Sequence, residues 1–225
     1  MIESEKLKRA LNSVDRAVDR GDFPGATIAI GSSSGVENTY QYGKAALYPK
    51  VSELNIDTLY DLASLTKVIG TTTLYMRFIE EGLVTFHDRV VDYVSDFQGK
   101  EKEDVTLFNL LTHTSGLPAH LPFYELCSDY KDAIDHIANV ELEYSPGTEV
   151  IYSDLGFILL GYILEEVGGS RLDELFNRYI FTPLGMENTC FNPTTDNIAA
   201  TEIDKATGEA IVGKCHDENG RFFDG

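Results

Sequence analysis

Most of the strand-like sequence lies in the first sixty residues, and this distribution limits the folds open to the chain. ATIAI and ENTYQYG are two strand-like runs joined by GSSSG, a pattern that predicts a hairpin. A helical pattern, LKRALNSVDRAVDRG, precedes them, and helical patterns dominate from about Asp61 onward. Two strands alone make a marginal sheet. We therefore expect an α+β fold whose sheet needs more strands after the helical part.

The later helical stretches are LTKVIGTTTLYMRFIEEG, VTLFNLLTH, LGFILLGYILEEVGG and SRLDELFNRYIF. Ser170 and Asp173 are spaced like a capping box at the start of the last stretch. The tail from Asn192 to Gly225 is polar and weakly periodic. Because little in it qualifies as strand, we expect the chain to be incomplete at its C-terminal end.

Composition excludes several classes of function. The chain has 225 residues, 43% of them hydrophobic, which suits one large or two small domains. A formal net charge of −19 repels phosphate backbones and anionic membranes, so we expect no nucleic-acid partner. No apolar run approaches the roughly 20 residues of a membrane span. The start of the chain lacks the apolar core of a signal peptide, and we expect a cytoplasmic protein.

The three cysteines are widely spaced, with no CxxC pair, so neither a zinc site nor a disulfide framework is predicted. We expect no cofactor. GSSSG matches the G-x-S-x-G nucleophile elbow, but a second strand-like run follows it where an elbow needs a helix. We interpret GSSSG as the hairpin turn.

The S-x-x-K pattern occurs twice, and sequence context separates the two copies. Lys131, three residues after Ser128, lies among acidic residues, so its ammonium should stay charged. Lys67 is the one charge between Asp61 and Arg77, and helical spacing brings its amine toward Ser64. Desolvation would lower the pKa of Lys67 and let it activate the serine. The alternatives are a helix-edge lysine and Ser64 as an N-cap.

A second candidate group lies in EVIYSDLGFILLG. Tyr152 ends a short β-prone run before an apolar helix, where its hydroxyl could serve as a proton shuttle or its ring could simply pack. Asp154 could be the N-cap of that helix, and Ser153 could equally be the cap. We expect a structural role for His113, at a helix end with a turn. His216 and its acidic neighbours do not make a credible metal site.

Six segments follow one another along the chain: FPGATIAIG, TYQYGKA, YDLASLTKVIGTTT, VTLFNLLTHTSGLP, YSPGTEVIYSDLGFILLG and PLGMENTCF. In these segments and their order, the chain resembles the serine beta-lactamase-like family. This family includes class C beta-lactamases, penicillin-binding DD-peptidases and related esterases. The resemblance covers roughly residues 8–192. It implies an antiparallel sheet with flanking helices and an inserted helical subdomain.

The resemblance also implies roles for four residues. Ser64 would be the acylated nucleophile, Lys67 its proton partner and Tyr152 the tyrosine of the Y-x-N motif. Asp154 would face the substrate in place of the asparagine of that motif, keeping the acceptor and losing the donor. Its carboxylate would hold Lys67 charged and shift base duty to Tyr152. The K-T-G or H-x-G of the third motif is absent from the chain.

These points predict a serine hydrolase that forms an acyl-enzyme on a small-molecule ester or a peptide amide, with beta-lactam hydrolysis less favoured. The alternative is a non-catalytic binding module or an inactive fragment. We expect residues 1–58 to start the α/β subdomain and residues 59–182 to form the helical subdomain. Residues 183–225 should return toward the α/β subdomain. The sequence predicts no oligomeric state.

Overall fold

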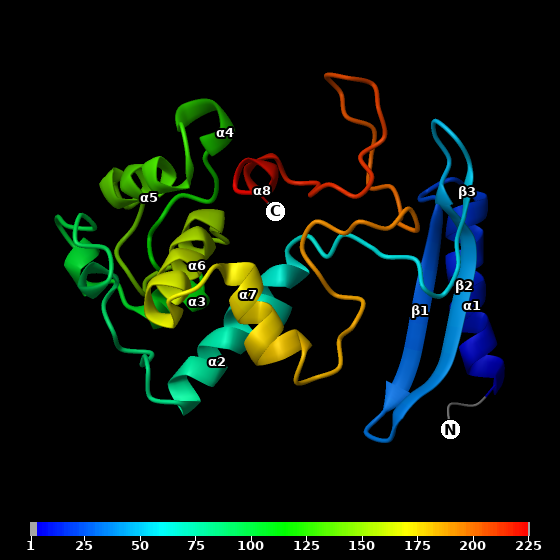
Figure 1. The fold of residues 1–225 in the computed structure, drawn as a ribbon, viewed down its shortest axis with the longest axis horizontal. Coiled ribbons are helices and arrows are strands. Elements are labelled where there is room, and N and C mark those ends of the chain that lie inside the picture. The colour runs from blue at the N-terminus through cyan, green and yellow to red at the C-terminus, as the bar shows by residue number, and fades with distance from the viewer. Residues whose placement is uncertain (1–3, 225) are drawn as a thin grey trace. The chain divides into compact units, whose positions relative to one another are not determined.

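The structure, a computed structural model, describes residues 4–224 and has the predicted α+β composition. Residues 1–3 and 225, which belong to the first and last predicted segments, lie outside the described residues. Contacts divide the chain into two compact units (Figure 1). Unit 1 comprises residues 1–61 and 192–216, and unit 2 comprises residues 62–191 and 217–225. The sequence-based boundaries after residues 58 and 182 stay a prediction.

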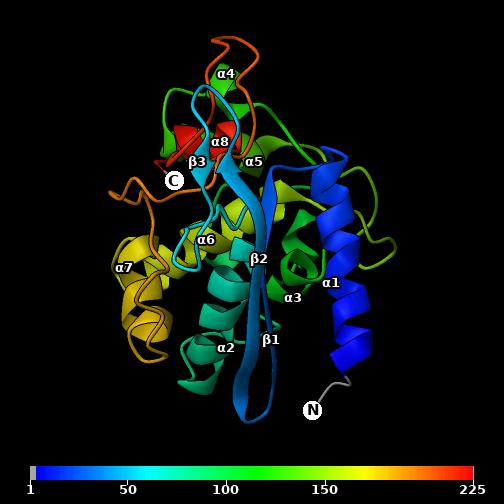
Figure 2. The same ribbon diagram turned by 90° about the vertical axis from the view of Figure 1, so that its right-hand side faces the viewer.

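Unit 1 is built on the predicted hairpin. Strand β1 (Gly25–Ser32) pairs antiparallel with β2 (Gly35–Ala46), and β2 pairs with the short β3 (Ser52–Glu53), giving the order β1-β2-β3. GSSSG forms the turn, as predicted. Helix α1 (Ser4–Asp19) lies along the hairpin (Figure 2), where Tyr40 donates a hydrogen bond to Asp15. The helical period of α1 allows this, because it places every fourth side chain on the same face.

The return segment of unit 1 is joined to the first segment by backbone hydrogen bonds. Leu59 and Ile198 form a parallel bridge, in which the Leu59 N–H donates to Asn197 and the Ala199 N–H donates to Leu59. The Ala200 N–H donates to Ala45 at the end of β2. These bonds satisfy backbone groups that neither segment could satisfy alone.

Unit 2 is helical. In chain order its elements are η1 (Lys67–Thr72), α2 (Thr73–Glu80), η2 (Val90–Asp92), η3 (Lys102–Asp104), α3 (Leu107–Leu111), α4 (Phe123–Leu126), α5 (Tyr130–Asn139), α6 (Asp154–Gly168), α7 (Leu172–Phe176), η4 (Asn177–Phe181) and α8 (Glu218–Phe222). The apolar helix α6 carries fully buried side chains such as Leu159 and Ile163. Its burial follows from the apolar residues that occupy most of its surface.

The start of α7 differs from the sequence expectation. The capping box at Ser170 and Asp173 is wrong, because Arg171 is the N-cap of α7 and makes no side-chain cap. The first free N–H of that helix, from Leu172, instead donates to Glu165 on α6. A tertiary partner thus replaces the local cap.

Among residues 4–224, no helix is long and apolar enough to cross a membrane.

Candidate active site

Ser64 lies on a tight turn directly before a helix. Ala63 has the positive φ of 45°, and helical structure begins at Leu65. The turn leaves Ser64 exposed while the helix that follows is anchored in unit 2. Lys67 lies one turn further on, and its Nζ donates to Ser64 Oγ over 3.2 Å. The helical spacing therefore brings the two groups together as predicted.

Lys67 also reaches across to the start of α6. Its Nζ lies 2.8 Å from Asp154 Oδ1 and 5.2 Å from the centre of the Tyr152 ring. The Lys67 side chain is only 18% exposed, whereas Tyr152 is half exposed. The structure therefore brings together all four residues that the sequence singled out: Ser64, Lys67, Tyr152 and Asp154.

The protonation of Lys67 is set by opposing influences. Burial is the largest and favours the neutral amine, but hydrogen bonds with Asp154 and Tyr152 outweigh it and raise the pKa of Lys67 above its usual range. The expectation that desolvation would lower this pKa is wrong. The charged state expected from the Asp154 carboxylate agrees with the observed direction.

The start of α6 is held by Ser153, which is 1% exposed. Ser153 Oγ accepts the N–H of Gly156, so Ser153 and not Asp154 is the N-cap. The same hydroxyl donates to the Pro118 carbonyl over 2.6 Å. Because Ser153 takes the cap, the neighbouring Asp154 carboxylate in the first turn is available to Lys67.

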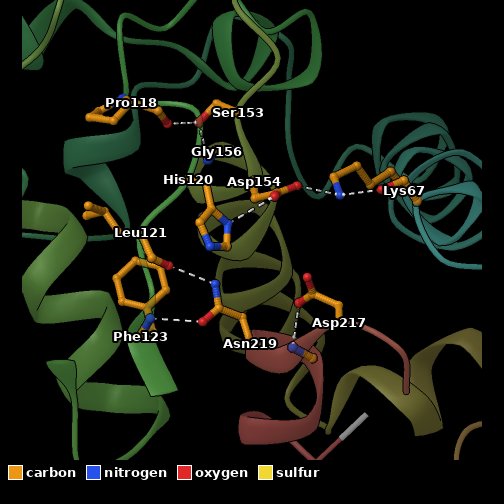
Figure 3. Close-up of polar contacts among 12 residues, drawn as sticks. Lys67, Pro118, His120, Leu121, Phe123, Ser153, Asp154, Gly156, Asp217 and Asn219 are labelled. Carbon is orange, nitrogen blue, oxygen red and sulfur yellow. Dashed lines mark hydrogen bonds and ion pairs between the residues drawn. The ribbon is translucent and has the colours of Figure 1, made fainter. Parts of the chain in front are cut away.

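Asp154 has a further contact on its other carboxylate oxygen. His120 Nδ1 lies 3.5 Å from Asp154 Oδ2 (Figure 3). The Asp154 N–H also donates to the Ala119 carbonyl. His120 is exposed and lies in a loop with no local signal for a site. Sequence reasoning missed it because the contact depends on the packing of two separate segments.

His113 lies behind Tyr152. The two rings are 4.4 Å apart between centroids, and the Ser153 N–H donates to His113 Nδ1. Burial and the nearby Lys67 charge lower the pKa of His113. His113 therefore has the predicted structural role, and the contacts through which it acts lie within the site.

The second S-x-x-K differs as predicted. Lys131 pairs with Asp135 over 3.1 Å and is mostly exposed, while Ser128 bonds to Asp132. The Asp135 hydrogen bond raises the pKa of Lys131. Ser128 and Lys131 thus have separate acidic partners and do not form a site.

Sequence comparison places the chain in a known class. A family model described as Beta-lactamase matches residues 12–211, and the chain therefore belongs to this family. Its fold is the beta-lactamase/transpeptidase-like fold. The resemblance noted in the sequence is thereby confirmed.

Individual relatives differ in their named activities. A protein of Salmonella agona (strain SL483) named "Putative D-alanyl-D-alanine carboxypeptidase" is 29% identical over 253 residues, which cover 96% of this chain and 58% of the relative. Among solved structures, EstCE1, a hydrolase with promiscuous acyltransferase activity, is 27% identical with a TM-score of 0.77, over 92% of this chain and 58% of EstCE1. A class C beta-lactamase, 24% identical with a TM-score of 0.79 over 93% of this chain and 58% of its own, shows the fold alone.

The chain thus spans 58% of the length of each of these three relatives.

Proposed function

We propose that this chain carries the acylation site of a serine hydrolase, which forms an acyl-enzyme on Ser64 from an ester or a peptide amide. The observation that carries the proposal is the position of Lys67. One ammonium bonds to Ser64 Oγ and to Asp154, with the Tyr152 ring beside it. In an activated nucleophile, the serine hydroxyl is hydrogen-bonded to a second polar group, and a third group orients that second one.

The charge on Lys67 assigns the proton transfers. A protonated lysine has no lone pair, so Tyr152 would act as the base in its phenolate form, with the Lys67 ammonium stabilising that negative charge. Taking the Ser64 proton would convert it to the neutral phenol. Ser64 Oγ then bonds to the carbonyl carbon, and the carbonyl oxygen takes the negative charge. The Ser64 N–H would supply one oxyanion donor.

Breakdown of the tetrahedral intermediate completes acylation. The bond to the leaving alcohol or amine breaks, and Tyr152 returns its proton to that group. Water then adds to the acyl-enzyme by the same sequence of transfers and releases the carboxylic acid and free Ser64. Asp154 would hold Lys67 in place throughout and face the substrate.

The substrate class follows from the relatives by analogy. The name of the Salmonella relative specifies a peptide-bond substrate, and EstCE1 is named a hydrolase. We favour small esters and peptide amides over beta-lactams, because Asp154 replaces the amide donor of the Y-x-N motif. The cytoplasmic location and the absence of a nucleic-acid partner stay predictions.

The test is covalent labelling with a fluorophosphonate probe, applied to the product of the complete reading frame. We expect an adduct on Ser64 that Ser64→Ala abolishes. Ser128→Ala, which removes the serine of the second S-x-x-K, should label at the wild-type rate. If Ser64→Ala labels as well as the wild type, the assignment is wrong and the non-catalytic alternative gains support.

A further inference from the structure

The backbone on both sides of Tyr152 is hydrogen-bonded to one residue. The N–H of Ile151 donates to the His113 carbonyl over 3.0 Å, and the N–H of Ser153 donates to His113 Nδ1 over 3.1 Å. When the residues on both sides of a position are hydrogen-bonded to another segment, the backbone at that position loses most of its rotational freedom. Tyr152 is therefore held by a two-point contact to His113.

The side chains add a third contact. The imidazole of His113 lies against the phenol ring of Tyr152, with centroids 4.4 Å apart and planes inclined by 34°. The same imidazole lies 5.1 Å from the ring of Phe157 on α6. Since Tyr152 is half exposed, ring packing on its inner side limits where its hydroxyl can point.

His113 is itself held in an uncommon conformation. Its φ is +58°, in the left-handed region that residues with a Cβ rarely adopt. Its carbonyl also accepts a hydrogen bond from the Tyr144 hydroxyl. Such a conformation persists only where the surroundings impose it, and here the carbonyl and Nδ1 both accept N–H groups of the Tyr152 segment.

We propose that His113 is the positioning residue for Tyr152, holding the phenol beside Lys67 without itself touching the substrate. The proposal rests on the proposed function for the role of Tyr152, but its structural content stands independently. Its chemical requirement is an acceptor at Nδ1, which only the neutral imidazole with its proton on Nε2 offers.

The surroundings keep His113 neutral. Burial and the Lys67 ammonium lower its pKa, with the Asp154 carboxylate opposing them. The Tyr152 phenol ring lies against the imidazole, and the Tyr144 hydroxyl bonds to the His113 carbonyl. Protonation at acid pH would set an N–H against the Ser153 N–H and release that side of the contact.

Two substitutions of similar size either keep or remove the features that His113 supplies. His113→Asn keeps an acceptor and tolerates the left-handed conformation, whereas His113→Leu has neither property. Hydrogen exchange of the Ser153 amide is measured in both. We expect His113→Leu to speed exchange about tenfold or more and His113→Asn to stay within about threefold of the wild type.

His87→Leu, in an exposed loop, is the control and should leave Ser153 exchange unchanged. Equal exchange in wild type, His113→Asn and His113→Leu would overturn the proposal. Equally fast exchange in both His113 variants would also overturn it, because the acceptor would then have no part in the contact.

Labelling of Ser64 gives the second readout. We expect His113→Leu to slow labelling about tenfold or more, and His113→Asn to label at close to the wild-type rate. In the wild type, protonation of His113 should lower the labelling rate at acid pH. His113→Asn should lack this part of the decline. An unchanged acid limb in His113→Asn would contradict the proposal. If the wild type does not label at all, the proposed function fails, and amide exchange, which needs no substrate, still decides the role of His113.

Discussion

At the scale of single residues, Asp154 distinguishes this site from the asparagine motif of its family. Its two oxygens face different partners, Lys67 at 2.8 Å and His120 at 3.5 Å. An amide in its place could not offset the Lys67 charge. The carboxylate therefore favours the charged form of Lys67.

Asp154→Asn should shift proton affinity away from Lys67. Burial favours the neutral amine of Lys67, and the Asp154 carboxylate opposes this effect. Without the carboxylate, the pKa of Lys67 should therefore fall. We expect the alkaline limb of the Ser64 labelling rate to move to lower pH. The measurement is the labelling rate as a function of pH in both proteins.

Asp135→Asn is the matched control, because it removes the carboxylate partner of the exposed Lys131. It should leave the labelling profile unchanged. An Asp154→Asn profile that coincides with the wild type would show that the carboxylate does not control Lys67.

At the scale of secondary structure, the helix that carries Lys67 contains a π-helical segment, η1, which the sequence did not indicate. Such segments are frequent at functional sites and widen the backbone locally. Gly70 within η1 is buried against Phe176 of α7, and a Cβ at Gly70 would overlap with that ring. Close packing of α7 thus requires a glycine one turn from Lys67.

Gly70→Ala should therefore destabilise the protein by about 1–3 kcal/mol and slow labelling of Ser64. Gly161→Ala on α6 is the comparison, since its Cβ would meet its nearest neighbour at an ordinary 3.5 Å. That variant should be neutral or slightly stabilising, because alanine is the better helix former. Equal unfolding free energies for the two variants in denaturant titration would contradict this reading.

The N-cap of α6 allows an independent test of how this helix supports the site. Ser153→Ala removes both the cap to Gly156 and the bond to Pro118 from a buried position. We expect a loss of about 2–3 kcal/mol, measured by chemical denaturation, together with slower labelling.

Asp129→Ala, which removes the exposed cap of α5, is the control. It should cost about 1 kcal/mol and leave labelling unchanged. A Ser153→Ala variant that loses stability but labels at the wild-type rate would separate the cap from the site.

At the scale of the whole molecule, charge opposes compactness. The net charge of −19 is spread over a chain of 225 residues, and like charges repel in the folded state more than in the expanded one. The exposed ion pairs, such as Lys44 with Glu53, add little to stability because water screens them.

Added salt should therefore stabilise the protein. Raising sodium chloride from about 0.02 to 0.2 M shortens the Debye length from roughly 20 to 7 Å. We expect the thermal midpoint to rise by about 2–4 °C, the shift that about 1 kcal/mol produces for a chain of this size. A midpoint that falls with salt would mean that attractive ion pairs outweigh the repulsion.

Local patterns made several parts of this protein predictable. The hairpin turn at GSSSG, the period of α6 and the approach of Lys67 to Ser64 each depend on residues close in sequence. Where two local solutions competed, as between Ser153 and Asp154 for the α6 cap, the sequence left the choice open. The capping box predicted at Ser170 failed because Glu165 supplied the bond from another helix.

By itself the sequence determined the class of fold and the helix carrying Ser64 and Lys67, because the hydrophobic period is a local property. The order of its motifs, through the family resemblance, made Tyr152 and Asp154 candidates. Only the tertiary structure decided that the pKa of Lys67 is raised, that the Ser153 N–H bonds to His113, and that η1 packs through Gly70. Each of these depends on segments far apart in the chain, and their meeting is set by packing of the whole unit.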